Sequence, residues 1–182
     1  MLSLRFADDA ELRALEVWHA DEFAEHIAAA EEHFARWLPW GHSAADSVGA
    51  AVLLNRYTQN LARDEGRSLG IWVGGKLSGG VLFRVWDNDS GMCELGAWLA
   101  PEATGRGLIT KAATAMIDWA FQVSDMHRVE WRCAPGNEPS RRVAGRLGMT
   151  LEGTLREAFV LHDARLDVEV WSVLAREWLT KR

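Results

Sequence analysis

The chain has 182 residues, of which 48% are hydrophobic and 25% are charged, and its formal net charge is −6. This length and balance predict one globular domain, residues 1–182, that buries its core without metals or disulfides. Scattered basic residues and short apolar runs exclude a phosphate-backbone footprint and a membrane span, so we expect a cytoplasmic protein with neither nucleic acid nor membrane as a direct partner.

The start of the chain is predicted to form two short strands followed by a helix. Residues 2–5 and 11–15 alternate apolar and polar side chains, which is typical of strands. Residues 19–38 then show helical spacing, with apolar residues three or four apart and acidic residues between them. Pro39 is expected to end this helix, because a proline ring cannot continue one.

A second helix is predicted to begin at Ser43 or Asp46, either of which can cap it, and to end near residue 64. An apolar stripe with helical spacing is expected to face the core. Its members are Val48, Val52, Leu53, Tyr57 and Leu61.

Further along, the period changes to that of strands. Residues 68–73 and 77–86 flank the pair Gly74-Gly75, which is typical of a hairpin turn. Residues 92–99 read as another strand, and residues 107–123 return to helical spacing. The remaining elements are predicted as a strand, a helix and two strands joined by a polar loop, at residues 128–133, 138–147, 149–159 and 167–174.

This order of elements predicts an α/β sandwich around one mixed sheet. The hairpins must be antiparallel, and the crossover from residues 92–99 to residues 128–133 should be parallel and right-handed. Cys93 and Cys133 lie inside apolar runs and not in a Cys-x-x-Cys or Cys/His cluster, so we expect two buried reduced thiols and no metal site.

The segment most informative about function is residues 98–110, where a strand ends in a glycine-containing loop and a long helix begins. Free backbone N–H groups and the positive end of a helix dipole meet at such a point, which favours a pyrophosphate. Gly105 and Gly107 allow close approach of the backbone, and Arg106 adds charge. A Walker A loop is excluded because Gly-Lys-Ser/Thr is absent, and Thr110 replaces the third glycine of a dinucleotide fingerprint.

Residues 102–107 resemble the loop of the GCN5-related N-acetyltransferases that cradles the coenzyme A pyrophosphate. Residues 94–99 resemble the preceding strand of that family, which splays from its neighbour and binds the pantetheine arm. Residues 137–143 and 147–153 are similar to the family's Asn-x-x-Ser and Gly-Phe-x-x-Glu-Gly segments. Residues 36–40 are similar to a motif of the RimJ/RimL type, which acetylates the N-termini of ribosomal proteins.

The resemblance implies a mostly antiparallel central sheet with helices on both faces and a splayed parallel pair at its centre. It implies acetyl-CoA as the co-substrate and a primary amine as the acceptor, in first place a protein N-terminus, and it leaves a homodimer open. The residues that it implies as contacts of coenzyme A are Trp98, Leu99, Thr104, Gly105, Arg106, Gly107, Leu108, Ile109, Asn137 and Ser140.

The chain departs from the family pattern at two places. Glu102 stands where the family usually has glutamine or arginine, so backbone amides and Arg106 must hold the phosphates. Many relatives carry a tyrosine that protonates the leaving thiolate on the helix after the asparagine, whereas Tyr57 is the single tyrosine here. Ser140 is either a substitute proton donor or an ordinary hydroxyl at a helix start, and Asn137 binds the pantetheine amides, caps the helix, or does both.

Aminolysis of a thioester requires a neutral amine, a polarised carbonyl group and a departing thiolate. An α-amino group has an ordinary pKa of about 7.7–8.0 and needs only modest help from a base. Glu94 is the candidate base, acting through water, and the alternative is a salt-bridged strand residue. A backbone N–H near Trp98 or Leu99 is the candidate for polarising the carbonyl group.

Trp37 and Trp40 flank Pro39 and either wall the acceptor groove or form a hydrophobic plug under the loop. Glu157 and His162, in the last hairpin, are further candidates for contact with the acceptor. The acidic balance suits a cationic acceptor by long-range attraction. Two other functions remain open: acetylation of a small amine such as an aminoglycoside or a polyamine, and a coenzyme A-binding sensor without turnover.

Overall fold

The structure is a computed structural model and describes residues 3–180. Its strands are β1 (Leu4–Ala7), β2 (Ala10–Ala14), β3 (Arg67–Val73), β4 (Lys76–Asp87), β5 (Met92–Leu99), β6 (Arg128–Cys133), β7 (Thr150–Leu161) and β8 (Ala164–Leu174). Its helices are η1 (Val17–His19), α1 (Ala20–Ala28), α2 (Glu31–Ala35), α3 (Ser47–Ala62), η2 (Pro101–Ala103), α4 (Leu108–Gln122), α5 (Glu138–Arg146) and α6 (Ala175–Leu179). Leu2, where the first predicted strand begins, lies outside the described residues.

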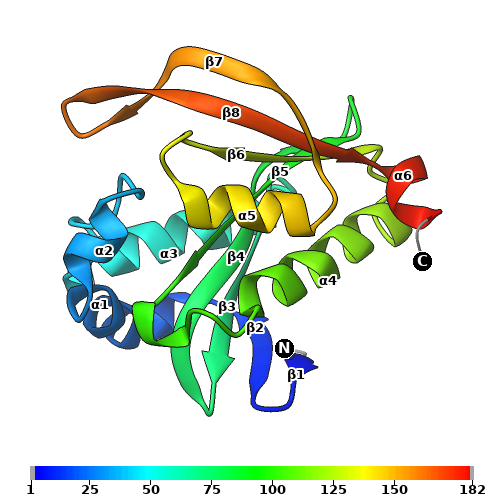
Figure 1. Ribbon diagram of the computed structural model, residues 1–182. Coiled ribbons are helices and arrows are strands. Elements are labelled where there is room, and N and C mark those ends of the chain that lie inside the picture. The colour runs from blue at the N-terminus through cyan, green and yellow to red at the C-terminus, as the bar shows by residue number, and fades with distance from the viewer. Residues whose placement is uncertain (1–2, 181–182) are drawn as a thin grey trace. The chain divides into compact units, whose positions relative to one another are not determined.

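The strands of the described residues form one eight-stranded sheet in the order β1-β2-β3-β4-β5-β6-β8-β7 (Figure 1). β5 and β6 are parallel. The pairs β1–β2, β2–β3, β6–β8 and β7–β8 are antiparallel. The predicted mixed, mostly antiparallel sheet with one parallel pair is therefore confirmed.

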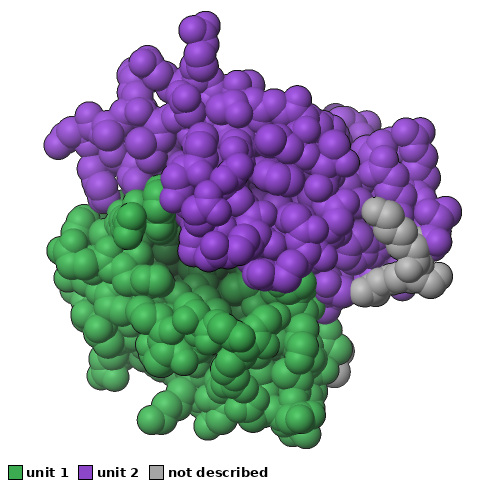
Figure 2. All heavy atoms as spheres, in the orientation of Figure 1, with its two compact units in different colours: residues 1–82, 97–112 green, residues 83–96, 113–182 purple. Residues whose placement is uncertain are grey.

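The chain divides into two compact units, which Figure 2 colours green and purple. Unit 1 comprises residues 1–82 and 97–112, and unit 2 comprises residues 83–96 and 113–182. β4, β5 and α4 each contribute residues to both units. The single domain that the sequence suggests stays a prediction.

The core of unit 1 is rich in aromatic side chains from its helices and strands. Its large buried members include Phe23, Ile27, Phe34, Leu54, Trp72 and Trp98. Burial of one such side chain contributes about 1.5–3 kcal/mol. Phe23 and Trp98 meet edge to face with ring centroids 5.4 Å apart, which the ring quadrupoles favour. Trp98 therefore anchors the end of β5 in this core.

The single helix predicted over residues 19–38 is wrong, because the chain breaks it. α1 ends at Ala28 and α2 begins at Glu31, and between them Ala30 has the non-helical angles φ −144° and ψ 41°. Alanine is the best helix former, so local propensity does not indicate a break here. Ile27 and Phe34, on either side of it, are both buried, so packing of the two segments overrides propensity.

The N-terminus of α3 is confirmed, but three members of its predicted stripe are wrong. Asp46 caps the helix by accepting a hydrogen bond from the Gly49 N–H at 2.8 Å. Val48, Val52 and Leu61 are 76%, 67% and 50% exposed. The buried face consists of Ala50, Leu53, Leu54 and Tyr57. A Cβ on Gly49 would lie 1.6 Å from the Ser43 carbonyl oxygen, so this close approach requires glycine at position 49.

The predicted hairpin of β3 and β4 is confirmed, and β4 then comes very close to β5. Gly74 and Gly75 have φ values of 57° and 82°, as a two-residue hairpin turn of type I′ requires. A Cβ on Gly80 would lie 2.6 Å from atoms of the Trp98 indole, and one on Gly79 would lie 2.5 Å from the Trp98 carbonyl oxygen. The two glycines thus leave room for the tryptophan that anchors β5.

Unit 2 holds β6, α5, α6 and a long hairpin of β7 and β8 (Figure 1). The polar loop predicted between residues 159 and 167 is wrong, because the strands continue to Leu161 and from Ala164. His162 follows β7 in the left-handed region, with φ 52°. The turn therefore occupies two residues, and cross-strand pairing orders most of the segment that the sequence suggests as a loop.

Both cysteines are free and buried, as predicted. Burial raises the pKa of Cys93 to about 12, with a further contribution from the charge of Glu130. None of the helices between residues 3 and 180 has the length and apolar character that a membrane crossing needs. Over the same residues, no group of three or more His, Cys, Asp or Glu side chains is placed to hold a metal ion.

Candidate active site

The loop between β5 and α4 has an open backbone at its two glycines. Gly105 and Gly107 have φ values of 79° and 71°, and a Cβ on either would meet nothing within 4 Å. α4 begins directly afterwards at Leu108. The first N–H groups of a helix have no intrahelical partner and carry the positive end of its dipole. These features together fit a pyrophosphate.

The side chains of the loop play smaller parts than its backbone. The Thr104 hydroxyl donates to the Pro101 carbonyl oxygen at 2.7 Å. Leu108 is buried and Ile109 is half-buried, so they can offer N–H groups but little charge. Arg106, expected to hold phosphate, pairs with Asp9 at 2.5 Å. Both partners are about half exposed, and such a pair contributes little stability, so phosphate can displace Asp9.

At the end of β5 the tryptophan side chain does not face outward, and two nearby backbone groups already have partners within the protein. Trp98 is 6% exposed and packs in the core, so its indole is not available to coenzyme A. The Leu99 carbonyl oxygen lies 3.1 Å from Nε2 of His33, a residue of α2. The neighbouring Ala100 N–H donates to the Ser78 carbonyl oxygen at 2.8 Å.

The parallel ladder of β5 and β6 is short. It joins Met92 to Arg128, Cys93 to Val129 and Glu94 to Glu130, and it ends there. β5 continues for five more residues, to Leu99. On the edge of β5 that faces β6, the backbone groups of residues 95–99 have no partner from β6. They suit a ligand with amides, such as pantetheine.

Glu94, the candidate base, is 5% exposed and lies between two arginines. Its Oε1 is 3.0 Å from Nη1 of Arg84, and its Oε2 is 3.7 Å from Nε of Arg132. Arg132 also pairs with Glu130 at 2.8 Å. The salt-bridged alternative is thus what the structure shows. It does not remove the base, because a carboxylate has more acceptor sites than these two contacts occupy.

Asn137 and Ser140 are brought together at the start of α5. Oδ1 of Asn137 accepts from the Ser140 N–H at 3.2 Å, so the predicted helix cap is confirmed. Oγ of Ser140 accepts from the indole N–H of Trp131 at 2.9 Å. The same hydroxyl is a hydrogen-bond partner of the Cys133 thiol. Ser140 therefore has a defined position beside a sulfur atom.

The four candidate acceptor contacts fall into two sets. Trp40 packs against Phe23 and Trp98, each with ring centroids 5.8 Å away, which is the packing that the plug alternative predicts. Trp37 is half-buried, with the Arg36 guanidinium 5.3 Å from its ring centroid.

The second set lies in unit 2, on the hairpin of β7 and β8. Glu157 has φ 51° within an irregular stretch of β7, and its N–H donates to Oδ1 of Asp167 at 2.8 Å. His162 forms part of the two-residue turn.

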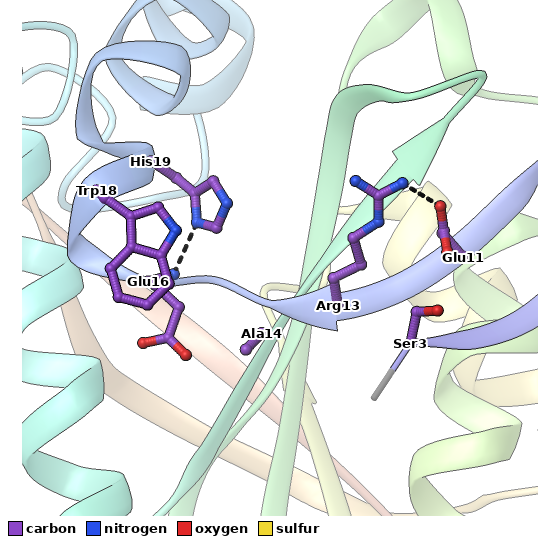
Figure 3. A pocket seen from close by; sticks show the side chains of 7 residues that line it. All are labelled: Ser3, Glu11, Arg13, Ala14, Glu16, Trp18 and His19. Atoms are coloured by element: carbon purple, nitrogen blue, oxygen red, sulfur yellow. Dashed lines mark hydrogen bonds and ion pairs between the residues drawn. The ribbon is translucent and has the colours of Figure 1, made fainter. Parts of the chain in front are cut away.

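A cavity of about 440 Å³ lies on unit 1 and contains none of the predicted site residues. Figure 3 shows Arg13 pointing to Glu11, and Trp18 lying beside His19 and Glu16. The residues that line this cavity are Ser3, Glu11, Arg13, Ala14, Glu16, Trp18 and His19. It shares no residue with the loop at residues 104–109.

Sequence reasoning missed several partners of the candidate residues. Arg84 and Arg132 hold Glu94, Asp9 holds Arg106, and Trp131 holds Ser140. Each partner lies outside the element of the residue that it holds, so no local spacing indicates it. A parallel pairing of residues 92–99 with residues 128–133 would have indicated Arg132, but only with its register known.

A strand that leaves its parallel neighbour, a loop with two left-handed glycines and an open helix N-terminus define a coenzyme A-dependent acyltransferase. The chain belongs to the GNAT acetyltransferase family, because the model described as "Acetyltransferase (GNAT) domain" matches residues 10–150. It is accordingly an acetyltransferase with acetyl-CoA as its donor.

Named relatives and solved structures agree with this family. The chain is 29% identical over 180 residues to "Putative ribosomal N-acetyltransferase YdaF" of Bacillus subtilis (strain 168), and the aligned region covers 98% of each chain. It is 33% identical over 97 residues to "Ribosomal-protein-serine acetyltransferase" of Escherichia coli (strain K12), or 53% of this chain and 54% of the relative. A crystal structure described as "Probable acetyltransferase" is 28% identical, with a TM-score of 0.91 over 97% of this chain and 99% of the other.

Proposed function

We propose that the chain transfers the acetyl group of acetyl-CoA to the N-terminal α-amino group of a ribosomal protein. The observation that carries this proposal is the similarity over 98% of both chains to a relative named as a ribosomal N-acetyltransferase. The partial similarity to a ribosomal-protein-serine acetyltransferase supports it. Such an acceptor places the reaction in the cytoplasm. A homodimer stays a prediction.

The donor is proposed to bind along the end of β5 and the loop that follows it. N–H groups of residues 104–109 hold the pyrophosphate, and the unpaired edge of β5 holds the pantetheine amides. Asn137 adds a contact to the pantetheine beside its capping role. A backbone N–H near Trp98 or Leu99 polarises the thioester carbonyl group.

Acetyl transfer then needs a base and a stabilised thiolate. Glu94 takes a proton from the incoming ammonium through water, and its fixed charge attracts the cationic amine. The amine nitrogen attacks the carbonyl carbon, the C–N bond forms and the C–S bond breaks. Ser140 stabilises the departing sulfur, which gains one proton as the nitrogen loses one. Trp37, Trp40, Glu157 and His162 are the proposed contacts of the acceptor.

A panel of amines with acetyl-CoA tests this function. It contains peptides with the N-terminal sequences of ribosomal proteins, the same peptides with a blocked N-terminus and an internal lysine, a polyamine and an aminoglycoside. We expect release of free thiol and one acetyl group on the N-terminal residue of the unblocked peptides. Faster turnover of the polyamine or the aminoglycoside would favour the small-amine function, and binding of coenzyme A without thiol release would favour a sensor.

A further inference from the structure

A buried indole holds the hydroxyl group at the start of α5. Trp131, on β6, is 4% exposed, and its Nε1 donates to Oγ of Ser140 at 2.9 Å. The Ser140 N–H donates to Oδ1 of Asn137 at 3.2 Å. Ser140 is therefore fixed twice, through its backbone by the helix cap and through its side chain by a neighbouring strand.

The indole also decides where the hydroxyl hydrogen can point. An indole N–H is a donor only, whereas a hydroxyl has one hydrogen to donate and two lone pairs that accept. Because Trp131 occupies a lone pair of the Ser140 oxygen, the hydroxyl hydrogen must serve a different partner.

A sulfur atom is such a partner in this structure. Burial raises the pKa of the Cys133 thiol, and its hydrogen bond with Ser140 opposes this rise by stabilising the thiolate. The hydroxyl that Trp131 holds thus has a sulfur atom as a hydrogen-bond partner. A coenzyme A thiolate has the same chemistry.

We propose that Trp131 is a positioning residue for the departure of the coenzyme A thiolate, because its N–H holds the Ser140 hydroxyl with the hydrogen available to sulfur. This inference rests on the proposed function. When the C–S bond of the tetrahedral intermediate breaks, its electron pair stays on sulfur, and Ser140 donates a hydrogen bond to it. The sulfur then takes, through water, the proton that the amine nitrogen lost, and Ser140 remains a hydroxyl.

The neighbouring strand offers a matched control. Trp171, on β8, is the register partner of Trp131, and its indole N–H donates to Oε2 of Glu169 at 2.9 Å. Trp171→Phe therefore removes an indole N–H of the same sheet without touching Ser140. Trp131→Phe removes the N–H that holds Ser140 and keeps an aromatic ring in the core.

The experiment is a double-mutant cycle of Trp131→Phe with Ser140→Ala, with Trp171→Phe as the control and with an amine of the panel that the wild type acetylates. We expect Trp131→Phe to lower kcat by about 3- to 10-fold, the value of one neutral hydrogen bond, with the KM for acetyl-CoA unchanged. Ser140→Ala should lower kcat at least as much. Trp131→Phe should add no further loss in the Ser140→Ala background, because its effect acts through Ser140.

Two outcomes would overturn the inference. The first is that Trp131→Phe has a kcat as high as that of Trp171→Phe, although Ser140→Ala lowers kcat. The second is that the fold losses of kcat in Trp131→Phe and Ser140→Ala multiply in the double variant. Should Trp131→Phe not fold, benzothienylalanine at position 131 replaces the N–H by sulfur at nearly constant shape and gives the same comparison. Because the cycle uses any amine that is acetylated, rejection of the N-terminal acceptor by the panel is a separate result and leaves the test intact.

Discussion

Nη1 of Arg84 lies 3.0 Å from Oε1 of Glu94, so a guanidinium from the neighbouring strand holds the proposed base. Glu94→Gln keeps the shape of this side chain and removes its charge. If the carboxylate takes the proton of the amine, kcat/KM should fall by about 100-fold or more, and the acidic limb of the pH–rate profile should change. Steady-state kinetics over pH with one amine measures both effects.

The matched control for Glu94 is Arg84→Gln, which breaks the same ion pair and leaves the carboxylate in place. It should lower thermal stability but keep most of kcat/KM, because the second arginine, Arg132, still faces Glu94. Equal losses of activity in Arg84→Gln and Glu94→Gln would mean that the ion pair is needed and that the carboxylate is not the base.

Gly107→Val should weaken coenzyme A binding. The left-handed backbone at Gly107 costs a non-glycine residue about 1–2 kcal/mol, and the new side chain would project into the open space of the loop. We expect affinity for coenzyme A to fall by about 10-fold or more, the value of one lost hydrogen bond to a charged group, as measured by calorimetry. Gly74→Val shares the positive φ and the open surroundings in the turn before β4, so it reports backbone strain alone. Equal coenzyme A affinity in the two variants would remove this loop from the site.

Glu152 should stabilise the fold at neutral pH and lose that effect in acid. Hydrogen bonds from Arg128, the largest cause, and from Ser172 lower the pKa of Glu152 from 4.5 to about 2. Because the folded pKa is depressed, the stabilisation is present above pH 4.5 and is lost as pH falls from 4.5 to about 2.

Glu152→Gln tests this pH window. The side chain is 43% exposed, so solvent weakens the interaction, and we expect Tm to fall by only about 1–4 °C at pH 7. The difference from wild type should shrink between pH 4.5 and 2 in thermal melts. Glu65→Gln, which removes the charge of another exposed carboxylate, is the control. A difference that stays constant down to pH 2 would contradict the assignment.

His26 should make the fold less stable in mild acid. Within residues 3–180, its Nε2 is buried without a hydrogen-bond partner. Burial lowers the pKa of His26 below 6.5, and the charges of Glu102 and Glu22 oppose this only in part. Its contribution to stability is therefore present above pH 6.5 and is lost as pH falls from there toward the folded pKa.

His26→Phe removes both the titration and the unpartnered nitrogen, next to the rings of Phe34 and Trp98. Urea unfolding should show this variant to be as stable as the wild type or more stable at pH 7.5, with its advantage growing toward pH 5. A parallel decline of the two proteins between pH 7.5 and 5 would mean that His26 does not titrate in this range.

Much of the fold is predictable from the sequence because many of its signals are local. The pair Gly74-Gly75 indicates a hairpin turn, and Asp46 indicates a helix start, through preferences that a few residues carry by themselves. The break before α2 is not predictable, because alanine at position 30 favours the helix that the packing interrupts. The buried face of α3 is not predictable from spacing alone, because Val48, Val52 and Leu61 are apolar and have helical spacing, yet they are exposed.

The candidate site is likewise only partly predictable from the sequence. The glycine loop follows from local order, since a strand, Gly105, Gly107 and a helix are consecutive in the chain. The partners of its side chains cannot be predicted from local order, because Asp9 and Arg106 are 97 positions apart in the sequence. Trp98 looks like a site residue from its place beside the loop, yet its indole packs in the core.

The close approach of Gly80 to the indole of Trp98 constrains how this protein can evolve. Any larger residue at position 80 would overlap the ring, so such a change is tolerated only after position 98 has first become smaller. The reverse order passes through an intermediate with a clash. Descendants of this sequence should therefore keep glycine at position 80 for as long as they keep tryptophan at position 98, and the two positions should vary together across lineages.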